Sequence, residues 1–311
     1  RTDAEVFKPL EPDELAKQLL TRLPEGFTAY QTQNYIICHN ASKSYAQWCG
    51  TLFEQLYKAF TNYWSRKGFE IGKPAFPLVA VVFADKASYA SYAKQELGRD
   101  PDTIIGYYNL QTNRMTMYDL TGVQQLRRPG DRRTTAAQIN EMLARPDAER
   151  MVATIVHEAT HQVAFNCGLQ QRYADIPVWL SEGMAIYFET PDLQSSTGWR
   201  TIGNVNRVRL QGFREYLPRR KSESLKTLLM DDDRMRDPRT GLDAYAEAWA
   251  LNYFLIRQRP KQYVEYLKIL EQKPPLVQFG PEVRLRDFQQ AFGENLHQLD
   301  GEFIRYMSKV R

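Results

Sequence analysis

In the first 120 positions, segments with the apolar pattern of a strand alternate with segments that have the apolar spacing of a helix. Between residues 42 and 67 an apolar side chain recurs every three or four positions, which predicts an amphipathic helix that Gly68 ends. Residues 78–83 are apolar and rich in valine, a composition typical of a buried central strand. A second helix is predicted over residues 86–97. This part of the chain is therefore expected to form a sheet covered by helices.

Further strands are expected in the same half of the chain. Residues 30–39 are predicted to form one strand. Residues 104–108 and 114–118 flank a short polar turn, which predicts a β-hairpin. The first 27 residues, 1–27, are expected to form an arm with one short helix at 13–22.

The second half of the chain is expected to be mainly helical. Residues 120–135 are rich in arginine and contain Pro-Gly, so they are the best candidate for a linker. The helices predicted beyond this linker cover residues 149–167, 177–189, 204–216, 242–258, 260–271 and 296–309. Strands followed by helices predict an α+β fold.

Two clusters of like charge are interpreted as solvent-exposed loops. The linker carries Arg127, Arg128, Arg132 and Arg133, for which a bound anion is the alternative interpretation. The run Asp231-Asp232-Asp233 lacks the spaced oxygen ligands and the glycine turn of a calcium-binding loop. Neither cluster is expected to form a functional site.

Composition excludes several classes of protein. Hydrophobic residues make up 43% of the 311 positions, enough for a sizeable core. The 41 Lys and Arg residues against 37 Asp and Glu leave a net charge of +4, which is too small and too evenly spread to indicate a nucleic-acid partner. The longest uncharged apolar run, residues 78–84, is far shorter than the ~20 residues of a membrane-spanning helix. We therefore expect neither nucleic-acid binding nor a transmembrane segment in this chain.

Three cysteines are too few for a disulfide framework. Cys38 and Cys49 could pair if the protein is exported, which would leave Cys167 free; the alternative is three ordinary thiols in or near the core. The chain begins with the polar residue Arg1 instead of Met, so we expect any targeting segment to lie outside it. The sequence leaves the compartment and the oligomeric state open, and favours export to the periplasm, the cell surface or the medium.

Residues 157–161 read His-Glu-Ala-Thr-His, which is the strongest chemical signal in the chain. On a helix, His157 and His161 share one face, so both imidazoles can bind one zinc ion. Glu158 projects about 100° away around the helix, near the metal without binding it. From there it can act as general base toward a zinc-bound water. The helix is supported by an apolar stripe: Val152, Ile155, Val156, Ala159 and Val163.

A third ligand is available in the sequence Trp-Leu-Ser-Glu-Gly-Met-Ala, where Glu182 lies 21 residues after His161. A catalytic zinc site uses three protein ligands and keeps one position open. Gly183 and Ala185 are small, so we expect them to let two helices approach closely enough to share the ion. Glu189 lies on the same helical face as Glu182 and could hydrogen-bond a ligand imidazole. For Glu182 alone, the alternative is an exposed carboxylate favoured at a helix start.

Together these two blocks resemble the gluzincin metallopeptidases, the peptidase-MA-like zinc enzymes. The block Trp-Leu-Ser-Glu-Gly-Met-Ala-Ile-Tyr-Phe-Glu at 179–189 is very similar to that of the membrane-alanyl-aminopeptidases. The resemblance is specific over residues 150–190, and the overall layout is more similar to an uncharacterised bacterial gluzincin-like family. It implies a zincin-like fold, with a mixed β-sheet whose antiparallel edge hairpin packs on the His-Glu-x-x-His helix.

The predicted elements also suggest how the chain is divided. Residues 1–27 would be an N-terminal arm, and residues 28–168 a sheet-containing subdomain that ends in the zinc helix. Residues 169–311 would form a mainly helical C-terminal subdomain that completes the active site, so that both subdomains make one catalytic unit.

An edge strand that aligns a peptide substrate is also implied, and we assign this role to Gly106, Tyr107, Tyr108 and Asn109. Gly106 would let another backbone approach closely, and a β-bulge is the alternative reason for the glycine. The aminopeptidases carry Gly-x-Met-Glu-Asn in the comparable hairpin, which holds the substrate's free amine. Residues 106–110 contain no acidic residue. This difference favours an endopeptidase over an aminopeptidase.

Gluzincins similar to this chain use a tyrosine hydroxyl to stabilise the oxyanion, on a helix roughly sixty residues after the third ligand. Tyr245 lies 63 residues after Glu182, at the start of a predicted helix. We therefore assign Tyr245 a catalytic role. The alternative is a tyrosine at the rim of the helical core, packed near Trp249 one turn later.

The sequence thus predicts a zinc-dependent hydrolase of peptide bonds with one Zn²⁺ per chain, bound by His157, His161 and Glu182. Glu158 would be the general base, and a peptide or protein would be the substrate. The competing hypothesis is a non-catalytic binding module with a zincin fold and a residual or structural zinc. The presence of Glu158 argues against it, because a structural site needs no base and is usually closed by a fourth protein ligand.

Overall fold

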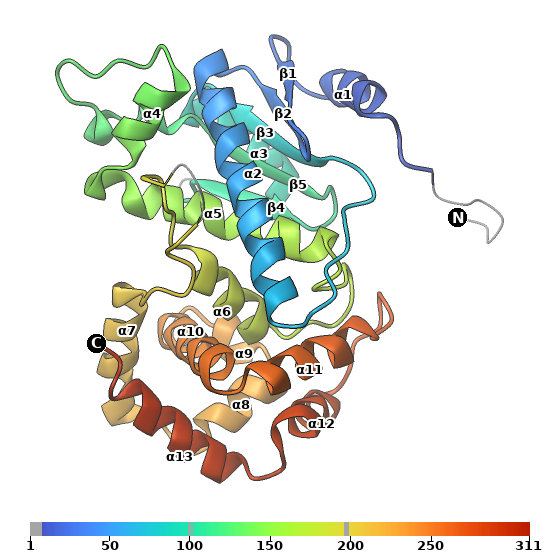
Figure 1. The fold of residues 1–311 in the computed structure, drawn as a ribbon, viewed down its shortest axis with the longest axis vertical. Helices are drawn as coiled ribbons and strands as arrows, with labels where there is room; N and C mark the ends of the chain where they lie inside the picture. The colour runs from blue at the N-terminus through green and yellow to red at the C-terminus, as the bar shows by residue number, and fades with distance from the viewer. Residues whose placement is uncertain (1–7, 99–100, 102, 196–198) are drawn as a thin grey trace. The chain divides into compact units, whose positions relative to one another are not determined.

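The computed structural model describes residues 8–98, 101, 103–195 and 199–311, and shows an α+β protein (Figure 1). The chain divides into two compact units. The first contains residues 1–59, 73–166 and 193–198, and the second contains residues 60–72, 167–192 and 199–311. The expected N-terminal arm is described from residue 8, and its first seven residues lie outside the described part. Its helix, α1, covers Pro12–Leu20.

A five-stranded mixed sheet forms the centre of the first unit (Figure 1). The strands are β1 (Thr28–Gln31), β2 (Tyr35–His39), β3 (Leu78–Phe83), β4 (Gly106–Asn109) and β5 (Arg114–Tyr118). Their order is β1-β2-β3-β5-β4. The three inner strands run parallel, and the two edge strands pair antiparallel with their neighbours. All residues of β2 and β3 are buried, which explains their nearly continuous apolar sequence.

The single strand expected at residues 30–39 is wrong, because two antiparallel strands occupy this region. The backbone N–H of Thr32 donates to the carbonyl oxygen of Tyr35 (2.9 Å) and closes the turn between them. The carboxylate of Glu54 on the following helix accepts hydrogen bonds from the Thr32 hydroxyl and the Asn34 N–H, both at 2.6 Å. A carboxylate twenty residues away therefore stabilises a turn that carries no glycine or proline.

Helices cover both faces of this sheet. Besides α1, the α-helices of the first unit are the N-terminal part of α2 (Lys43–Arg66), α3 (Lys86–Leu97), α4 (Ala136–Leu143) and α5 (Pro146–Asn166). On β4, the Tyr107 hydroxyl contacts Glu96 of α3, whereas the Tyr108 ring stacks on Phe165 of α5. Successive side chains of a strand point to opposite faces, so α3 and α5 lie on opposite sides of the sheet. The hairpin β4–β5 packs on α5, as expected.

The second unit is helical in its described residues. It contains the end of α2 and the helices α6 (Val178–Phe188), α7 (Arg207–Tyr216), α8 (Ser224–Met230), α9 (Asp233–Arg236), α10 (Gly241–Gln258), α11 (Pro260–Glu271), α12 (Pro281–Phe292) and α13 (Leu296–Met307). Helix α10 packs against α6, α7, α9, α11 and α13 (Figure 1). It is buried on nearly all sides, which fits its mostly apolar sequence after the first turn.

One charged group is fully buried in this unit. Glu247 of α10 is 0% exposed, and its carboxylate binds the guanidinium groups of Arg220 and Arg234, each at 2.7 Å. The hydroxyl of Ser224 donates to the same carboxylate. A buried carboxylate is tolerated when its oxygens are paired in this way, so the network ties α8 and α9 to α10.

Among the described residues, no helix is both long enough and apolar enough to cross a membrane.

Candidate metal centre and its surroundings

Helix α5 presents its histidines on the side opposite its apolar stripe. Helix α5 packs on the sheet, and the five members of the stripe are fully buried: Val152, Ile155, Val156, Ala159 and Val163. Packing of this stripe fixes the rotation of the helix about its axis. His157 and Glu158 are half-buried, and His161 is 8% exposed. The motif therefore lies where a rigid helix meets accessible space.

The two imidazoles converge at their Nε2 atoms. These atoms lie 3.2 Å apart, and the ring planes are inclined at 81°. Two nitrogens bound to one tetrahedral zinc at ~2.0–2.1 Å would be separated by ~3.3–3.4 Å. The observed spacing therefore fits joint coordination of one ion. It also fits a hydrogen bond between two neutral rings, in which one Nε2 donates and the other accepts.

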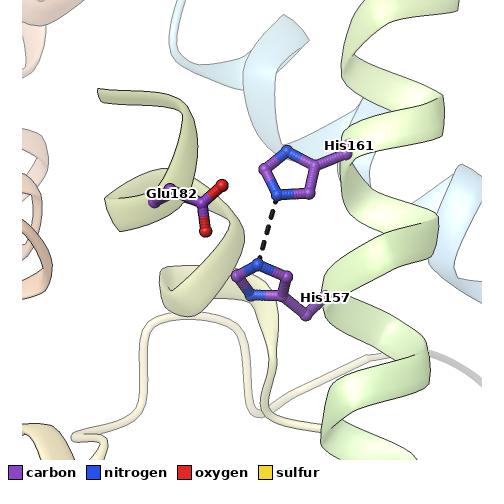
Figure 2. A group of neighbouring side chains, drawn as sticks. All are labelled: His157, His161 and Glu182. Carbon is purple, nitrogen blue, oxygen red and sulfur yellow. Dashed lines mark hydrogen bonds between the residues drawn. The ribbon is translucent and has the colours of Figure 1, made fainter. Parts of the chain in front are cut away.

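Glu182 of α6 completes a group that could hold a metal ion. The ligand atoms of His157, His161 and Glu182 all lie within 4.8 Å of one another. Figure 2 shows both imidazoles projecting from α5 and the carboxylate facing them. Two imidazole nitrogens and one carboxylate oxygen are a donor set that suits zinc and leaves a tetrahedral ion one open position. The three residues predicted to be ligands thus form one group.

Glu158 lies outside that group of three and contacts the sheet instead. Its carboxylate accepts a hydrogen bond from the backbone N–H of Tyr108, at 2.8 Å. The pKa of Tyr89 is raised mainly by burial, and the negative charge of the Glu158 carboxylate raises it further. The residue predicted to be the base is therefore directed at strand β4, which is the edge strand expected from the sequence.

Gly106 is in close contact with the neighbouring strand. A Cβ at this position would lie 3.1 Å from the carbonyl oxygen of Thr116 and from the Cβ of Met117, both on β5. The backbone that approaches Gly106 closely is thus that of its own sheet partner. The alternative of a β-bulge is also wrong, because β4 and β5 pair residue by residue without an insertion. Binding of a peptide along β4 stays a prediction.

The small residue Gly183 was expected to bring the two ligand-bearing helices together. It faces α10 instead. A Cβ at Gly183 would overlap the side-chain amide of Asn252 and lie 2.5 Å from the carbonyl oxygen of Ala248. Asn252 in turn donates to the carbonyl oxygen of Trp179 (3.0 Å), so its amide binds α6 through the space that the glycine leaves. Gly183 therefore serves the packing of α6 on α10.

Two further candidates have contacts within the helical unit. Glu189 ends α6, and its carboxylate accepts a hydrogen bond from the side chain of Asn206, the N-cap residue of α7 (2.8 Å). Tyr245 is half-buried in the second turn of α10, with the guanidinium of Arg209 above its ring at 5.6 Å. The roles assigned to Glu189 and Tyr245 stay predictions.

Asp232 is buried, so the interpretation of this aspartate as part of a solvent-exposed run is wrong. Asp232 is 6% exposed, and its carboxylate accepts a hydrogen bond from the N–H of Val178, the first residue of α6 (3.0 Å). It also pairs with Arg284, which binds Asp175 as well. The helix that carries Glu182 is therefore capped and oriented by a buried ion network. An Asp following α8 gives no local signal for a cap fifty-four residues away.

The cysteines and the arginine loop need no functional explanation. Cys38, Cys49 and Cys167 are free and buried. In the loop, Arg128 pairs with Asp147 (2.9 Å) and is exposed, as expected for a solvated segment.

Part of the chain is similar to a known protein family. Residues 151–277 match a family described as a protein of unknown function (DUF1570). The matched segment is less than half of the chain, and it includes the His-Glu-x-x-His motif, Glu182 and Tyr245. No curated protein matches the chain.

Proposed function

We propose that the protein is a zinc-dependent metallopeptidase of the gluzincin type, with His157, His161 and Glu182 as metal ligands. The observation that carries this proposal is the convergence of the two Nε2 atoms at 3.2 Å, with a carboxylate in the same group. The separation matches tetrahedral coordination, and the donor set suits zinc. The mixed sheet with an edge hairpin packed on α5 supports a zincin-like fold.

Zinc at this position would polarise the scissile carbonyl and lower the pKa of an attacking water to ~7. Glu158 would accept the proton of that water and pass it to the leaving amine. Its location supports this role, because it follows a ligand directly yet lies outside the ligand group. The hydrogen bond from the Tyr108 N–H orients the carboxylate that would accept the proton. The hydroxyl of Tyr245 would donate a hydrogen bond to the oxyanion.

The surroundings of β4 support an endopeptidase. An aminopeptidase needs a carboxylate that is free to bind the substrate's ammonium group. Glu96 contacts this hairpin, and its two oxygens accept hydrogen bonds from the hydroxyls of Tyr107 and Thr112. Glu96 lies on α3, on the face of the sheet opposite α5, and residues 106–110 of the hairpin contain no acidic residue, so this hairpin offers no carboxylate for a substrate amine at the zinc helix. We propose internal cleavage of peptides or proteins.

The proposal is tested by the zinc content of the purified protein together with digestion of a diverse peptide library. We expect about one zinc per chain and cleavage inside peptides. A chelator should abolish cleavage, and added zinc should restore it. Stable zinc without any cleavage would contradict catalysis and favour the binding module. Stepwise loss of amino-terminal residues would contradict the endopeptidase assignment.

A further inference from the structure

Side-chain amides join the β4–β5 hairpin to helix α5. Asn113 in the hairpin and Asn166 on α5 form a reciprocal pair, in which each Nδ2 donates to the other's Oδ1 at 2.8 Å. Gln162, also on α5, donates from its Nε2 to the carbonyl oxygens of Asn113 (3.1 Å) and Val79 (2.9 Å). Asn113 is 8% exposed and Gln162 is fully buried. These hydrogen bonds pair the buried side-chain nitrogens of all three amides, and because an unpaired buried donor is costly, they hold the hairpin on the helix.

Tyr108 connects this amide cluster, defined as Asn113, Gln162 and Asn166, to the predicted base. Its hydroxyl donates to the Oδ1 of Asn113 (2.7 Å), and its ring stacks on Phe165 with centroids 5.9 Å apart. The backbone N–H of the same residue donates to Glu158. The side chain of Tyr108 is thus anchored to the amide cluster while its backbone contacts the catalytic candidate.

We propose that the amide cluster is a positioning element that sets the distance between strand β4 and helix α5, and thereby holds the Tyr108 N–H on the Glu158 carboxylate. Its members act through Tyr108 and need not touch substrate. The consequence for hydrolysis rests on the proposed function, in which Glu158 is the base. The structural part, which concerns the N–H of one residue, does not depend on zinc or on activity.

The backbone at Asn113 makes a clean test possible. Its φ of +58° is a left-handed conformation that glycine adopts freely and that asparagine tolerates better than most residues. Asn113→Gly therefore keeps the turn while removing the side-chain amide from both Asn166 and Tyr108. Tyr108→Phe is a milder variant, because it removes one hydroxyl and retains the ring on Phe165.

Thr112 offers a matched control in the same turn. Its hydroxyl donates to Glu96 on α3, at 3.1 Å, so Thr112→Ala also removes one hydrogen bond from the hairpin. Helix α3 lies on the face of the sheet opposite α5, so the lost bond does not join the hairpin to the zinc helix. A general loosening of the hairpin would affect both variants, whereas loss of positioning would affect Asn113→Gly.

The first measurement is amide hydrogen exchange at Tyr108, followed by NMR in the metal-free protein. Glu158→Ala identifies the bond, because it should accelerate this exchange by removing the acceptor. We expect at least about tenfold faster exchange in Asn113→Gly, a smaller acceleration in Tyr108→Phe and less than threefold in Thr112→Ala. Exchange at Tyr108 that is unchanged in Asn113→Gly, or equally faster in Thr112→Ala, would overturn the proposal.

Peptide hydrolysis by the zinc-loaded variants then tests the consequence. Misplacement of a catalytic group by about 1 Å can lower the rate by ~10²-fold, so kcat of Asn113→Gly should fall at least about tenfold. Zinc should stay at one per chain. An equal fall of kcat in Thr112→Ala would show that the amide cluster has no specific positioning role and contributes only to packing of the hairpin. If the wild type hydrolyses no peptide, the proposed function fails, and the exchange result decides the positioning role by itself.

Discussion

The Nε2 atoms of His157 and His161 lie 3.2 Å apart, although the two residues are separated by a full turn of α5. This convergence requires both side chains to turn toward each other, which two imidazoles do when they share a proton or an ion. With Glu182 in the same group, we expect the metal-bound state to be the functional one.

Replacing His161 by Ala should remove the zinc, because two ligands remain where three are needed. The zinc ion binds only the folded protein, so its loss also lowers the free energy of unfolding. The decrease is ~4 kcal/mol when the metal is present at a thousand times its dissociation constant. Zinc content and melting temperature check this. His297→Ala is the matched control, since His297 is exposed on α13. Full zinc occupancy in His161→Ala would remove this residue from the ligand set.

Gly183→Ala should destabilise the metal-free protein strongly, since its Cβ has no room between α6 and α10. Overpacking of this kind costs roughly 1–3 kcal/mol, and the nearest atoms here include a backbone oxygen that cannot move aside. Gly212→Ala is the control: its Cβ would lie 3.5 Å from that of Ala246, an ordinary contact, and alanine is favoured in a helix by ~1 kcal/mol. Melting temperatures should therefore move in opposite directions. A stable Gly183→Ala protein would contradict the close helix contact.

The ion network at the start of α6 predicts a dependence on pH. Burial opposes the charge of Asp175, but hydrogen bonds from the Arg284 guanidinium and the Phe279 N–H outweigh it and lower the pKa of this carboxyl. The resulting stability is present above the unfolded-state pKa of ~3.9 and is lost as the pH falls through the lower folded-state value.

At pH 6 Asp175→Asn should therefore have a free energy of unfolding roughly 3 kcal/mol or more below that of the wild type, and this difference should narrow toward pH 3. Asp237→Asn is the control. The pKa of Asp237 is lowered to about 2 by Arg239, but both groups are on the surface, where an ion pair contributes little. A gap between wild type and Asp175→Asn that stays constant from pH 6 to pH 3 would contradict the charged pair.

Tyr245→Phe tests the assignment of the oxyanion donor. The change removes one hydroxyl from a half-buried ring, so folding and zinc content should be preserved. Loss of an oxyanion donor typically lowers kcat by ~10²-fold or more. Tyr306→Phe, a half-buried tyrosine on α13, should leave kcat unchanged. If kcat of Tyr245→Phe is within threefold of the wild-type value, the catalytic role is contradicted and Tyr245 contributes only to packing.

Local spacing made the metal group predictable. His157, Glu158 and His161 lie within five consecutive residues of one helix, so their relative directions follow from helical geometry alone. The helices α2, α10 and α11 and the strand β3 were also predicted from local sequence, because each shows a long or uninterrupted apolar pattern. Glu182 was proposed because it lies 21 residues after His161 in a second predicted helix, next to the small residues Gly183 and Ala185, and the resemblance then supported it.

Features that depend on distant partners were missed. Asp232 is buried by its contacts with Val178 and Arg284, neither of which is near it in sequence. Likewise, the turn at residues 32–34 exists because Glu54 accepts its hydrogen bonds. The helices α4, α8 and α9 span about two turns or fewer, and α12 carries Arg284 among its inward residues, so their apolar periodicity is weak.

The central claim is that Glu158 is the base of a zinc-dependent hydrolase, and Glu158→Gln tests it most directly. Glutamine keeps the size of the side chain and can still accept the Tyr108 N–H, but it cannot take up the proton. Zinc per chain and kcat for a peptide cleaved by the wild type should be measured on the same preparations. We predict one zinc in both proteins and a fall in kcat of ~10²-fold or more in the variant. Equal kcat values at equal zinc content would contradict the account.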